Sequence, residues 1–227
     1  MKAPLPENEA LRLAALREYR ILDTAAERAF DDLAALASYI CDVPMATISL
    51  VDAHRQWFKS RIGVDAQETS RDVAFCAHTI LSAAPLIVPD ATKDQRFADS
   101  ELVLQEPRIR FYAGFPLTTP EGYGLGALCA IDRQPRELTP AQAEAMAALS
   151  RQVMALLEFR RVTAQLASAL ETVRKLGELL PICSWCKRIR DDQGYWNQLE
   201  QFLTTNNGIV FTHGVCPECF QKMVQTA

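Results

Sequence analysis

The sequence predicts an α+β protein in which an antiparallel sheet carries helices on one face and is followed by a long helix and a small cysteine-rich module. Three observations predict this order. Two helical stretches precede short apolar runs that alternate with turns between residues 45 and 132, which indicates hairpin strands packed under helices. After Pro140 a helical pattern continues without glycine or proline until Gly177. Four of the seven cysteines then lie in two Cys-x-x-Cys pairs near the end of the chain.

The composition is that of an ordinary globular protein. Of 227 residues, 49% are hydrophobic and 23% are charged, which suits one medium domain and something smaller. The net charge of −4 argues against nucleic-acid binding. The N-terminal residues lack the apolar core of a signal peptide, and no apolar run approaches the ~20 residues of a membrane span. Because clustered cysteines suit a reducing compartment, we expect a cytoplasmic protein that binds neither nucleic acid nor membrane.

Apolar spacing and turn residues place the elements of the first part in order. Two amphipathic helices come first, followed by two strands, a short helix and a third strand. A polar loop over 89–105 then leads to a hairpin that turns at Thr119–Gly122. The expected helices and strands are Asn8–Arg20, Glu27–Ile40, Met45–Val51, Gln56–Arg61, Phe75–Ser82, Pro85–Val88, Arg110–Leu117 and Leu125–Asp132.

A long helix is expected from Thr139 to Leu180. Thr139 is a good N-cap, with Pro140 at the first helical position and Gln142 completing a capping box. The first half, through Phe159, is expected to pack against the sheet. In the second half apolar residues recur at alternating steps of four and three, which predicts a parallel homodimeric coiled coil through residues 155–180. The expected seam is Ala155, Phe159, Val162, Leu166, Ala169, Val173, Leu176 and Leu180.

Two cysteine knuckles in the last part predict a structural zinc site. Cys183 and Cys186 form the first knuckle, and Cys216 and Cys219 form the second, with His213 just before it. A two-residue gap lets both thiolates of a knuckle reach one ion, and two knuckles complete a tetrahedron. We expect one zinc per chain, with His213 either replacing one thiolate or donating a hydrogen bond to one. A dithiol switch and inert buried thiols are the alternatives.

The cysteine-rich module spans residues 181–227 and is too small to depend on its own core, for which a metal is the usual remedy. A turn at Asp191–Gly194, a helix over Tyr195–Thr204 and a short strand over Ile209–Phe211 are expected between its two knuckles. The module resembles a short unit found at the C-terminal end of bacterial signalling proteins that contain GAF or PAS domains.

Several phrases of the first part resemble, in order, a GAF domain of bacterial sensor and signalling proteins. They are TISLVDAHRQWFKSRIG, AFCAHTIL, LIVPDATKDQRFADSELV and IRFYAGFPLTTPEGYGLGALCAIDRQPREL. The resemblance covers about residues 8–160. It implies an antiparallel sheet with helices on one side and a small-molecule pocket on the other, and a role in sensing or dimerisation. It does not supply the ligand, because one fold hosts many functions.

The resemblance places the ligand pocket near five residues, which are Phe75, Cys76, His78, Phe111 and Tyr112. Bilin attachment in related domains needs a cysteine directly before a histidine, whereas Ala77 separates Cys76 from His78 here. Sulfoxide reduction needs a resolving cysteine, which residues 89–116 lack. No cyclic-nucleotide signature is visible, and no haem or flavin is expected. Cys41, Cys76 and Cys129 are expected to be small buried hydrophobic residues.

The predicted organisation is a GAF domain over 1–160 with its core at about 27–137, a linker helix over 138–180, and the zinc module over 181–227. We expect no catalytic residues, because no nucleophile–base pair, phosphate cradle or carboxylate dyad is present. The favoured function is a non-enzymatic signalling sensor or adaptor that relays to an unknown protein partner. One alternative is a redox or metal sensor whose knuckle thiolates are the input. The other is a GAF-type thiol redox enzyme.

Overall fold

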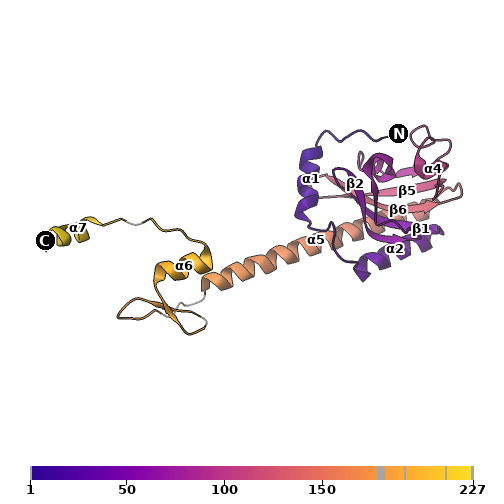
Figure 1. Ribbon diagram of the computed structural model, residues 1–227. Coiled ribbons are helices and arrows are strands. Elements are labelled where there is room, and N and C mark those ends of the chain that lie inside the picture. Colours follow the sequence, from indigo (N-terminus) through magenta and orange to yellow (C-terminus); the bar gives the residue numbers. More distant parts are fainter. Residues whose placement is uncertain (1, 178–181, 192, 213, 226–227) are drawn as a thin grey trace. The chain divides into compact units, whose positions relative to one another are not determined.

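The computed structural model describes residues 2–177, 182–191, 193–212 and 214–225. The chain divides into two compact units, residues 1–167 and 168–227, and α5 passes from one to the other (Figure 1). The first unit is built on a six-stranded sheet in the order β3-β2-β1-β6-β5-β4, in which every neighbouring pair is antiparallel. This is the predicted α+β architecture.

The described elements follow the expected order with small changes in their bounds. The strands of the first unit are β1 Met45–Val51, β2 Arg55–Ile62, β3 Glu68–Ser70, β4 Leu86–Val88, β5 Phe111–Thr118 and β6 Gly124–Asp132. Its helices are α1 Glu9–Glu18, α2 Arg28–Cys41, the 3-10 turn η1 Arg71–Val73, α3 Phe75–Thr79, α4 Glu101–Leu104 and α5 Pro140–Gly177. The short elements β3, η1 and α4 were not expected from the sequence.

The two faces of the sheet carry different layers. On one face α1, α2 and the first half of α5 pack on side chains such as Ile48, Leu50 and Leu128; α2 and α5 lie under the sheet in the view of Figure 1. On the other face α3 and α4, which belong to the crossover between β3 and β5, pack on Tyr112 and Cys129; the third element of this crossover, β4, is an edge strand of the sheet. Successive strand residues point to opposite faces, so each inner strand contributes to both cores.

A β-bulge interrupts the pairing of β1 with β2. Ile48 lies opposite Ser60 but Ser49 lies opposite Phe58, which leaves Lys59 as an extra residue on β2. Both Lys59 and Ser60 then face the start of α2, where Lys59 Nζ bonds to Glu27 Oε1 at 2.6 Å and Ser60 Oγ bonds to Asp31 Oδ1 at 2.7 Å. Consecutive residues of a regular strand would face opposite sides, so the bulge re-aims one side chain.

The capping box at the start of α5 is present as predicted. The amide N–H of Thr139 donates to Gln142 Oε1 at 3.0 Å, and the amide N–H of Gln142 donates to Thr139 Oγ1 at 3.2 Å. Gln142 Nε2 also donates to the carbonyl of Ile40 at 2.9 Å, which ties α5 to the end of α2. Met146, Val153, Met154 and Leu157 are buried along this half of the helix.

The second unit contains short elements after α5. The strands β7 Ile189–Arg190 and β8 Trp196–Asn197 form a hairpin, and α6 Leu199–Asn207 and α7 Pro217–Gln225 follow. The two ends of the expected turn are bonded to each other, since the Gly194 amide donates to the Asp191 carbonyl at 3.0 Å. The expected helix over 195–204 begins later, because residues 196 and 197 pair with β7. Residues 209–211, which were expected to form a strand, do not form one.

A carboxylate at the start of α1 holds two buried arginines. Glu9 accepts hydrogen bonds from Arg12, which is 1% exposed, and from Arg71 of η1, which is 6% exposed. Burial would raise the pKa of Glu9, but the hydrogen bonds from the two guanidinium groups lower it to about 2. Because this value lies below the ordinary 4.5, ionised Glu9 stabilises the fold above about pH 4.5, and this stabilisation is lost as the pH falls toward 2.

Glu9→Gln is therefore expected to lower the free energy of unfolding at pH 7 by about 2 kcal/mol, because two buried guanidinium groups lose their counter-ion. Urea denaturation followed by circular dichroism measures the effect. The difference from the wild type should shrink below pH 4.5 and vanish near pH 2. Glu7→Gln, at an exposed neighbouring position, is the control and should change stability little. Equal effects of the two substitutions would contradict the role of Glu9.

Candidate functional site

The structure brings together four of the five residues expected at the ligand pocket. Phe75, Cys76 and Tyr112 belong to the core under the crossover, and the Phe75 ring lies 5.0 Å from the Tyr112 ring. His78 contacts this group through Phe97, edge to face at 4.8 Å between ring centroids. Phe111 lies on the opposite face with α2 and α5, because adjacent residues of β5 cannot share a face.

The expected pocket is filled by its own side chains. Phe75 stacks on Phe97 with 4.0 Å between ring centroids, and Phe75, Cys76 and Tyr112 are each at most 3% exposed. A ligand at this place must displace these aromatic rings or open the crossover. Ligand binding under the crossover therefore stays a prediction, and it would require the loss of the packing between these side chains.

Two thiols meet in this buried region. Cys76 Sγ lies 3.3 Å from Cys129 Sγ, and both residues are at most 2% exposed. Ser49 Oγ donates to Cys76 Sγ at 2.9 Å, and the Tyr112 hydroxyl donates to it at 3.4 Å. Thr79 Oγ1 lies 2.7 Å from the Tyr112 hydroxyl, which extends the polar chain.

The hydrogen bonds make the two thiols unequal. Burial alone would raise the pKa of Cys76, but hydrogen bonds from Cys129, Ser49 and Tyr112 lower it. Burial and the hydrogen bond with Cys76 raise the pKa of Cys129. Cys41 is also buried, as expected, but it lies in the other core, and burial raises its pKa to about 11.

Sequence reasoning missed the meeting of Cys76 with Cys129. It sought a second cysteine only within residues 89–116, whereas the partner lies on β6. A signal was available in the strand pattern, because Leu128 and Ala130 face the core under α2 and α5, and Cys129 stands between them in the same strand. A residue between them must face the crossover, where Cys76 lies.

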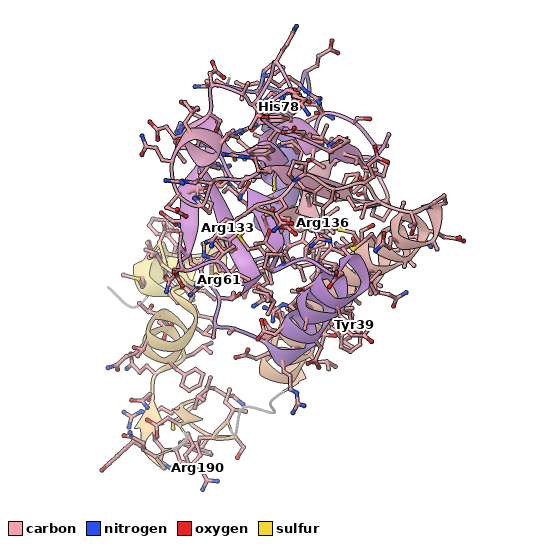
Figure 2. All side chains as sticks on the ribbon, turned by 90° about the vertical axis from the view of Figure 1, so that its right-hand side faces the viewer. Tyr39, Arg61, His78, Arg133, Arg136 and Arg190 are labelled. Atoms are coloured by element: carbon pink, nitrogen blue, oxygen red, sulfur yellow. The ribbon has the colours of Figure 1, made fainter. Side chains whose placement is uncertain are left out.

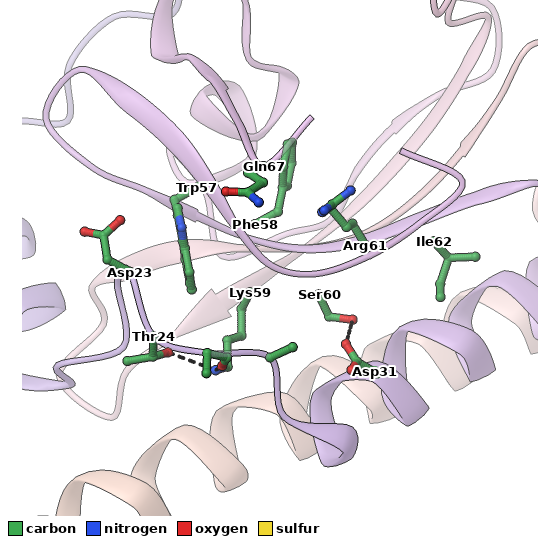
Figure 3. A pocket seen from close by; sticks show the side chains of 12 residues that line it. Asp23, Thr24, Asp31, Trp57, Phe58, Lys59, Ser60, Arg61, Ile62 and Gln67 are labelled. Atoms are coloured by element: carbon green, nitrogen blue, oxygen red, sulfur yellow. Dashed lines mark hydrogen bonds between the residues drawn. The ribbon is translucent and has the colours of Figure 1, made fainter. Parts of the chain in front are cut away.

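A cleft of about 790 Å³ lies beside the bulged part of β2 (Figure 3). Its walls are β2, the loop that follows it, and the segment that joins α1 to α2. The lining residues are Asp23, Thr24, Ala25, Ala26, Asp31, Trp57, Phe58, Lys59, Ser60, Arg61, Ile62 and Gln67. Its size suits a small ligand, and its charged and aromatic side chains offer several kinds of contact. Arg61, which lines the cleft, lies well apart from His78 of the crossover in Figure 2.

One lining residue connects the cleft to α5. The ammonium of Lys59 donates to Thr24 Oγ1, to the carbonyl of Ala25 and to Glu27 Oε1 at 2.6–2.9 Å, so its three protons are used. Glu27 also accepts a hydrogen bond from Arg160 of α5. Burial would raise the pKa of Glu27, but Lys59 and Arg160 lower it. Glu27 thus joins the wall of the cleft to the helix.

A second polar cluster holds α5 at the same level. The Tyr19 hydroxyl donates to Glu158, which also accepts two hydrogen bonds from Arg161 at 2.9–3.0 Å. The guanidinium carbon of Arg161 lies 5.6 Å from the centre of the Tyr19 ring. Burial and the Glu158 carboxylate raise the pKa of Tyr19. Glu158 and Arg160 are therefore bonded to the capping residues at the end of α1 and the start of α2, just where the helix leaves the core.

Beyond these contacts α5 exposes apolar side chains. Phe159 is 68% exposed, Val162 53%, Leu166 58% and Leu170 60%. The first three belong to the expected seam. The later seam positions Val173, Leu176 and Leu180 lie outside the side chains that the structure describes.

In the first knuckle the backbone turns so that amide N–H groups point at the sulfur of Cys183. The Cys186 amide donates to Cys183 Sγ at 3.5 Å, and the Lys187 amide donates to the Cys183 carbonyl at 3.0 Å. Lys187 adopts a positive φ of 60°, which turns the chain back so that the Cys183 amide reaches the Arg188 carbonyl at 2.8 Å. Hydrogen bonds from the amides of Cys186 and Trp185 lower the pKa of Cys183.

The second knuckle lies at the start of α7. The Cys216 carbonyl accepts a hydrogen bond from the Phe220 amide, and the amides of Cys219 and Glu218 lower the pKa of Cys216. N–H groups aimed at sulfur favour thiolates, which are the form that binds zinc. Within each knuckle the amides therefore favour the form of cysteine that binds zinc. Within the described residues, which omit His213, no three His, Cys, Asp or Glu side chains are grouped closely enough to hold one ion.

No helix in the described parts of the chain is both long and apolar enough to cross a membrane. The expected absence of nucleic-acid and membrane partners stays a prediction.

Comparison with known proteins identifies the first unit. The family model described as "GAF domain" matches residues 21–157. A cyclic di-GMP phosphodiesterase of Pseudomonas aeruginosa is 47% identical over 133 residues, which make up 59% of this chain and 23% of that protein. The chain thus spans about a quarter of the length of this curated relative.

Solved structures share the fold. The GAF domain of a phosphoenolpyruvate-protein phosphotransferase from Coxiella burnetii aligns with a TM-score of 0.53 and 12% identity, over 68% of this chain and 96% of that one. The Acinetobacter counterpart gives 0.51 and 15%, over 68% and 98%. The PixJ GAF domain of Thermosynechococcus elongatus, in its blue-light absorbing form, gives 0.52 and 16%, over 70% and 96%.

At these identities the structures establish the fold and not the ligand. The family match, in contrast, covers more than half of the chain, and the sheet with its helical layer has the architecture that the resemblance implied. The chain belongs to the GAF domain family.

Proposed function

We propose that this chain is a sensor or adaptor in cytoplasmic signal transduction, without catalysis of its own, whose GAF domain binds a small ligand or a partner and relays the change through α5. One observation carries the proposal: α5 is part of the domain core at one end and leaves it at the other. Leu157 is 1% exposed, whereas every side chain from Val162 to Thr172 is exposed, on all faces of the helix. Any rearrangement of the core therefore acts on the helix that continues beyond it.

The cleft beside β2 is the proposed input site. A ligand that competes for the Lys59 ammonium changes the charge around Glu27, and Glu27 holds Arg160 of α5. The ligand shifts the helix only as far as it binds one arrangement better than the other, and such couplings are typically about 1–3 kcal/mol. The crossover residues Phe75, Cys76, His78 and Tyr112 are an alternative input site that needs opening of α3.

The proposed output lies beyond the GAF domain. The exposed seam of α5 would pair with a second copy over residues 155–180, and each chain would hold one zinc in its terminal module through Cys183, Cys186, Cys216 and Cys219. The module would then present a surface to a signalling protein. The relative from P. aeruginosa shares only the GAF region with this chain, which supports a sensory role and gives no reason to assign phosphodiesterase activity here.

A second candidate function has the knuckle thiolates as the input, released from zinc by oxidation. The amides that lower the pKa of Cys183 and Cys216 favour it. A mild oxidant that alters the signalling output of wild-type protein, and equally that of a variant with a blocked cleft, would support this candidate over the cleft.

Blocking the cleft tests the favoured proposal. Ala26 lines the cleft and is exposed, so Ala26→Trp should fill it without disturbing the core. In native mass spectrometry of protein purified from its natural host, a bound small molecule is expected on the wild type and absent from the variant. Hydrogen exchange of the amides at 158–166 is expected to differ between the two.

Ala29→Trp is the matched control. Ala29 is exposed on the first turn of α2 and does not line the cleft, so this variant should retain the adduct and the wild-type exchange. An adduct that persists in Ala26→Trp would refute the cleft as the input site. No adduct on any of the three proteins would contradict the small-ligand form of the proposal.

A further inference from the structure

The pair of buried thiols under the crossover has a chemistry that the sensor function does not use. Cys76 belongs to α3 and Cys129 to β6, and they are 53 positions apart in the chain. Their sulfur atoms nevertheless lie 3.3 Å apart. A disulfide bond is about 2.05 Å long, so the sulfurs need to approach by only about 1.3 Å for a bond to form.

Polar groups surround this pair, although the core is otherwise apolar. Besides Ser49 and Tyr112, which donate to Cys76 Sγ, the Ser49 hydroxyl lies 4.0 Å from Cys129 Sγ. A cysteine that serves only as a small hydrophobic residue needs no such donors, as Cys41 shows in the other core. Hydroxyl donors stabilise a thiolate, and the thiolate is the nucleophilic form of cysteine.

A glycine makes room for the donors. A Cβ atom on Gly114 would lie 2.2 Å from the Tyr112 hydroxyl oxygen and 2.7 Å from Thr79 Oγ1. The backbone of β5 thus admits the hydrogen-bonded pair of Tyr112 and Thr79 only because residue 114 has no side chain. The hydroxyl that donates to Cys76 depends on this arrangement.

We propose that Cys76 and Cys129 are a reversible redox pair, oxidised to a disulfide by hydrogen peroxide and reduced again by a dithiol. The Cys76 thiolate attacks one peroxide oxygen, the O–O bond breaks, and the leaving hydroxide takes up the thiol proton as water. Cys76 is then a sulfenic acid. The Cys129 sulfur attacks the Cys76 sulfur, the S–O bond breaks, and a second water leaves with the Cys129 proton. Two thiols and one peroxide give one disulfide and two waters.

Burial determines how the pair meets its oxidant. Both residues are at most 2% exposed, so reaction requires opening of the crossover around α3, a helix of five residues. Only small oxidants should reach the two thiols, and the disulfide would then fix α3 to β6. The pair is thus a switch for the crossover layer, and it acts independently of the cleft beside β2, which lies over the other face of the sheet.

Peptide mapping of the full-length wild-type protein tests the proposal without any substitution. The protein is treated with hydrogen peroxide, unfolded in the presence of an alkylating reagent, digested and analysed by mass spectrometry. The expected result is a peptide pair joined between Cys76 and Cys129, which dithiothreitol separates. Cys41 is the internal control, because it is buried without a nearby thiol and should remain alkylated.

The resolving cysteine is tested by Cys129→Ser. In this variant Cys76 should accumulate as a sulfenic acid that dimedone traps, whereas the wild type should show little trapping. Two results would overturn the proposal: Cys76 and Cys129 alkylated as fully as Cys41 after peroxide treatment of the wild type, or Cys76 joined chiefly to a knuckle cysteine. Circular dichroism before and after treatment ensures that the reacting protein is folded.

Discussion

Protein with Cys183 replaced by serine is expected to lose the fold of its terminal module while the GAF domain stays intact. The reason is the small core of that module. Among the side chains that the structure describes after residue 167, Ile189 alone is hydrophobic and buried, whereas Trp185 is 93% exposed and Val210 87%. Zinc binding in such units contributes about 10–16 kcal/mol and is coupled to their folding, so the loss of one thiolate should remove both together.

Metal analysis and hydrogen exchange check this expectation. Reduced, freshly purified wild type should contain one zinc per chain, and amides between 182 and 225 should exchange slowly only in the presence of zinc. Cys183→Ser and chelator treatment should both abolish this protection. Ser184→Ala, between the two cysteines of the first knuckle, is the control and should retain the metal. Less than half an equivalent of zinc in the wild type would contradict the site.

His213 lies outside the described residues, so its role stays open to the same experiment. If its imidazole is a ligand, His213→Ala should lose zinc as Cys183→Ser does. If it only donates a hydrogen bond to a ligand, stoichiometry should persist with an affinity about 10–100-fold lower.

Strong local patterns made much of the first unit predictable. The bounds of β1 agree with the sequence prediction, and α5 begins at its capping box, because each rests on residues that interact within one element. The segment Tyr195–Thr204, which was expected to be one helix and is divided between β8 and α6, shows the limit of such patterns. A helical spacing of apolar residues was real, but pairing of Trp196 with Arg190 places the first part in a strand, and that pairing depends on a neighbouring segment.

The candidate sites were less predictable because they arise between segments. The cleft depends on the bulge at Lys59, which follows from the register of β2 against β1. The order of apolar and polar residues within β2 does not indicate this bulge. The approach of Cys76 to Cys129 depends on how the crossover packs on β6. Phe111 and Tyr112 were placed in one pocket although the period of a strand separates them, an error that the sequence alone was sufficient to avoid.

Replacing Val162 and Leu166 with glutamate is expected to abolish the proposed dimer and leave a monomer. Both side chains are more than half exposed in the single chain and lie on the seam of α5 with Phe159. Burying a valine or leucine side chain stabilises by roughly 1.5–3 kcal/mol, and each seam position acts twice in a symmetric dimer. Glutamates would replace this gain with repulsion between like charges across the seam.

Sedimentation velocity at micromolar concentration measures the outcome, with Gln165→Glu as the control because it adds one negative charge per chain, against two in the double variant, at an exposed position beside the seam. The wild type and the control should sediment as dimers, and the double variant as a monomer. A monomeric wild type would rule out the coiled coil. Beyond Leu157 the described side chains of α5 include no fully buried residue, and most of the stability of a helix in a protein comes from packing of its apolar face. The monomeric variant should therefore also lose helical signal in circular dichroism, which links the stability of α5 to the second chain and makes it responsive to small changes in the GAF domain.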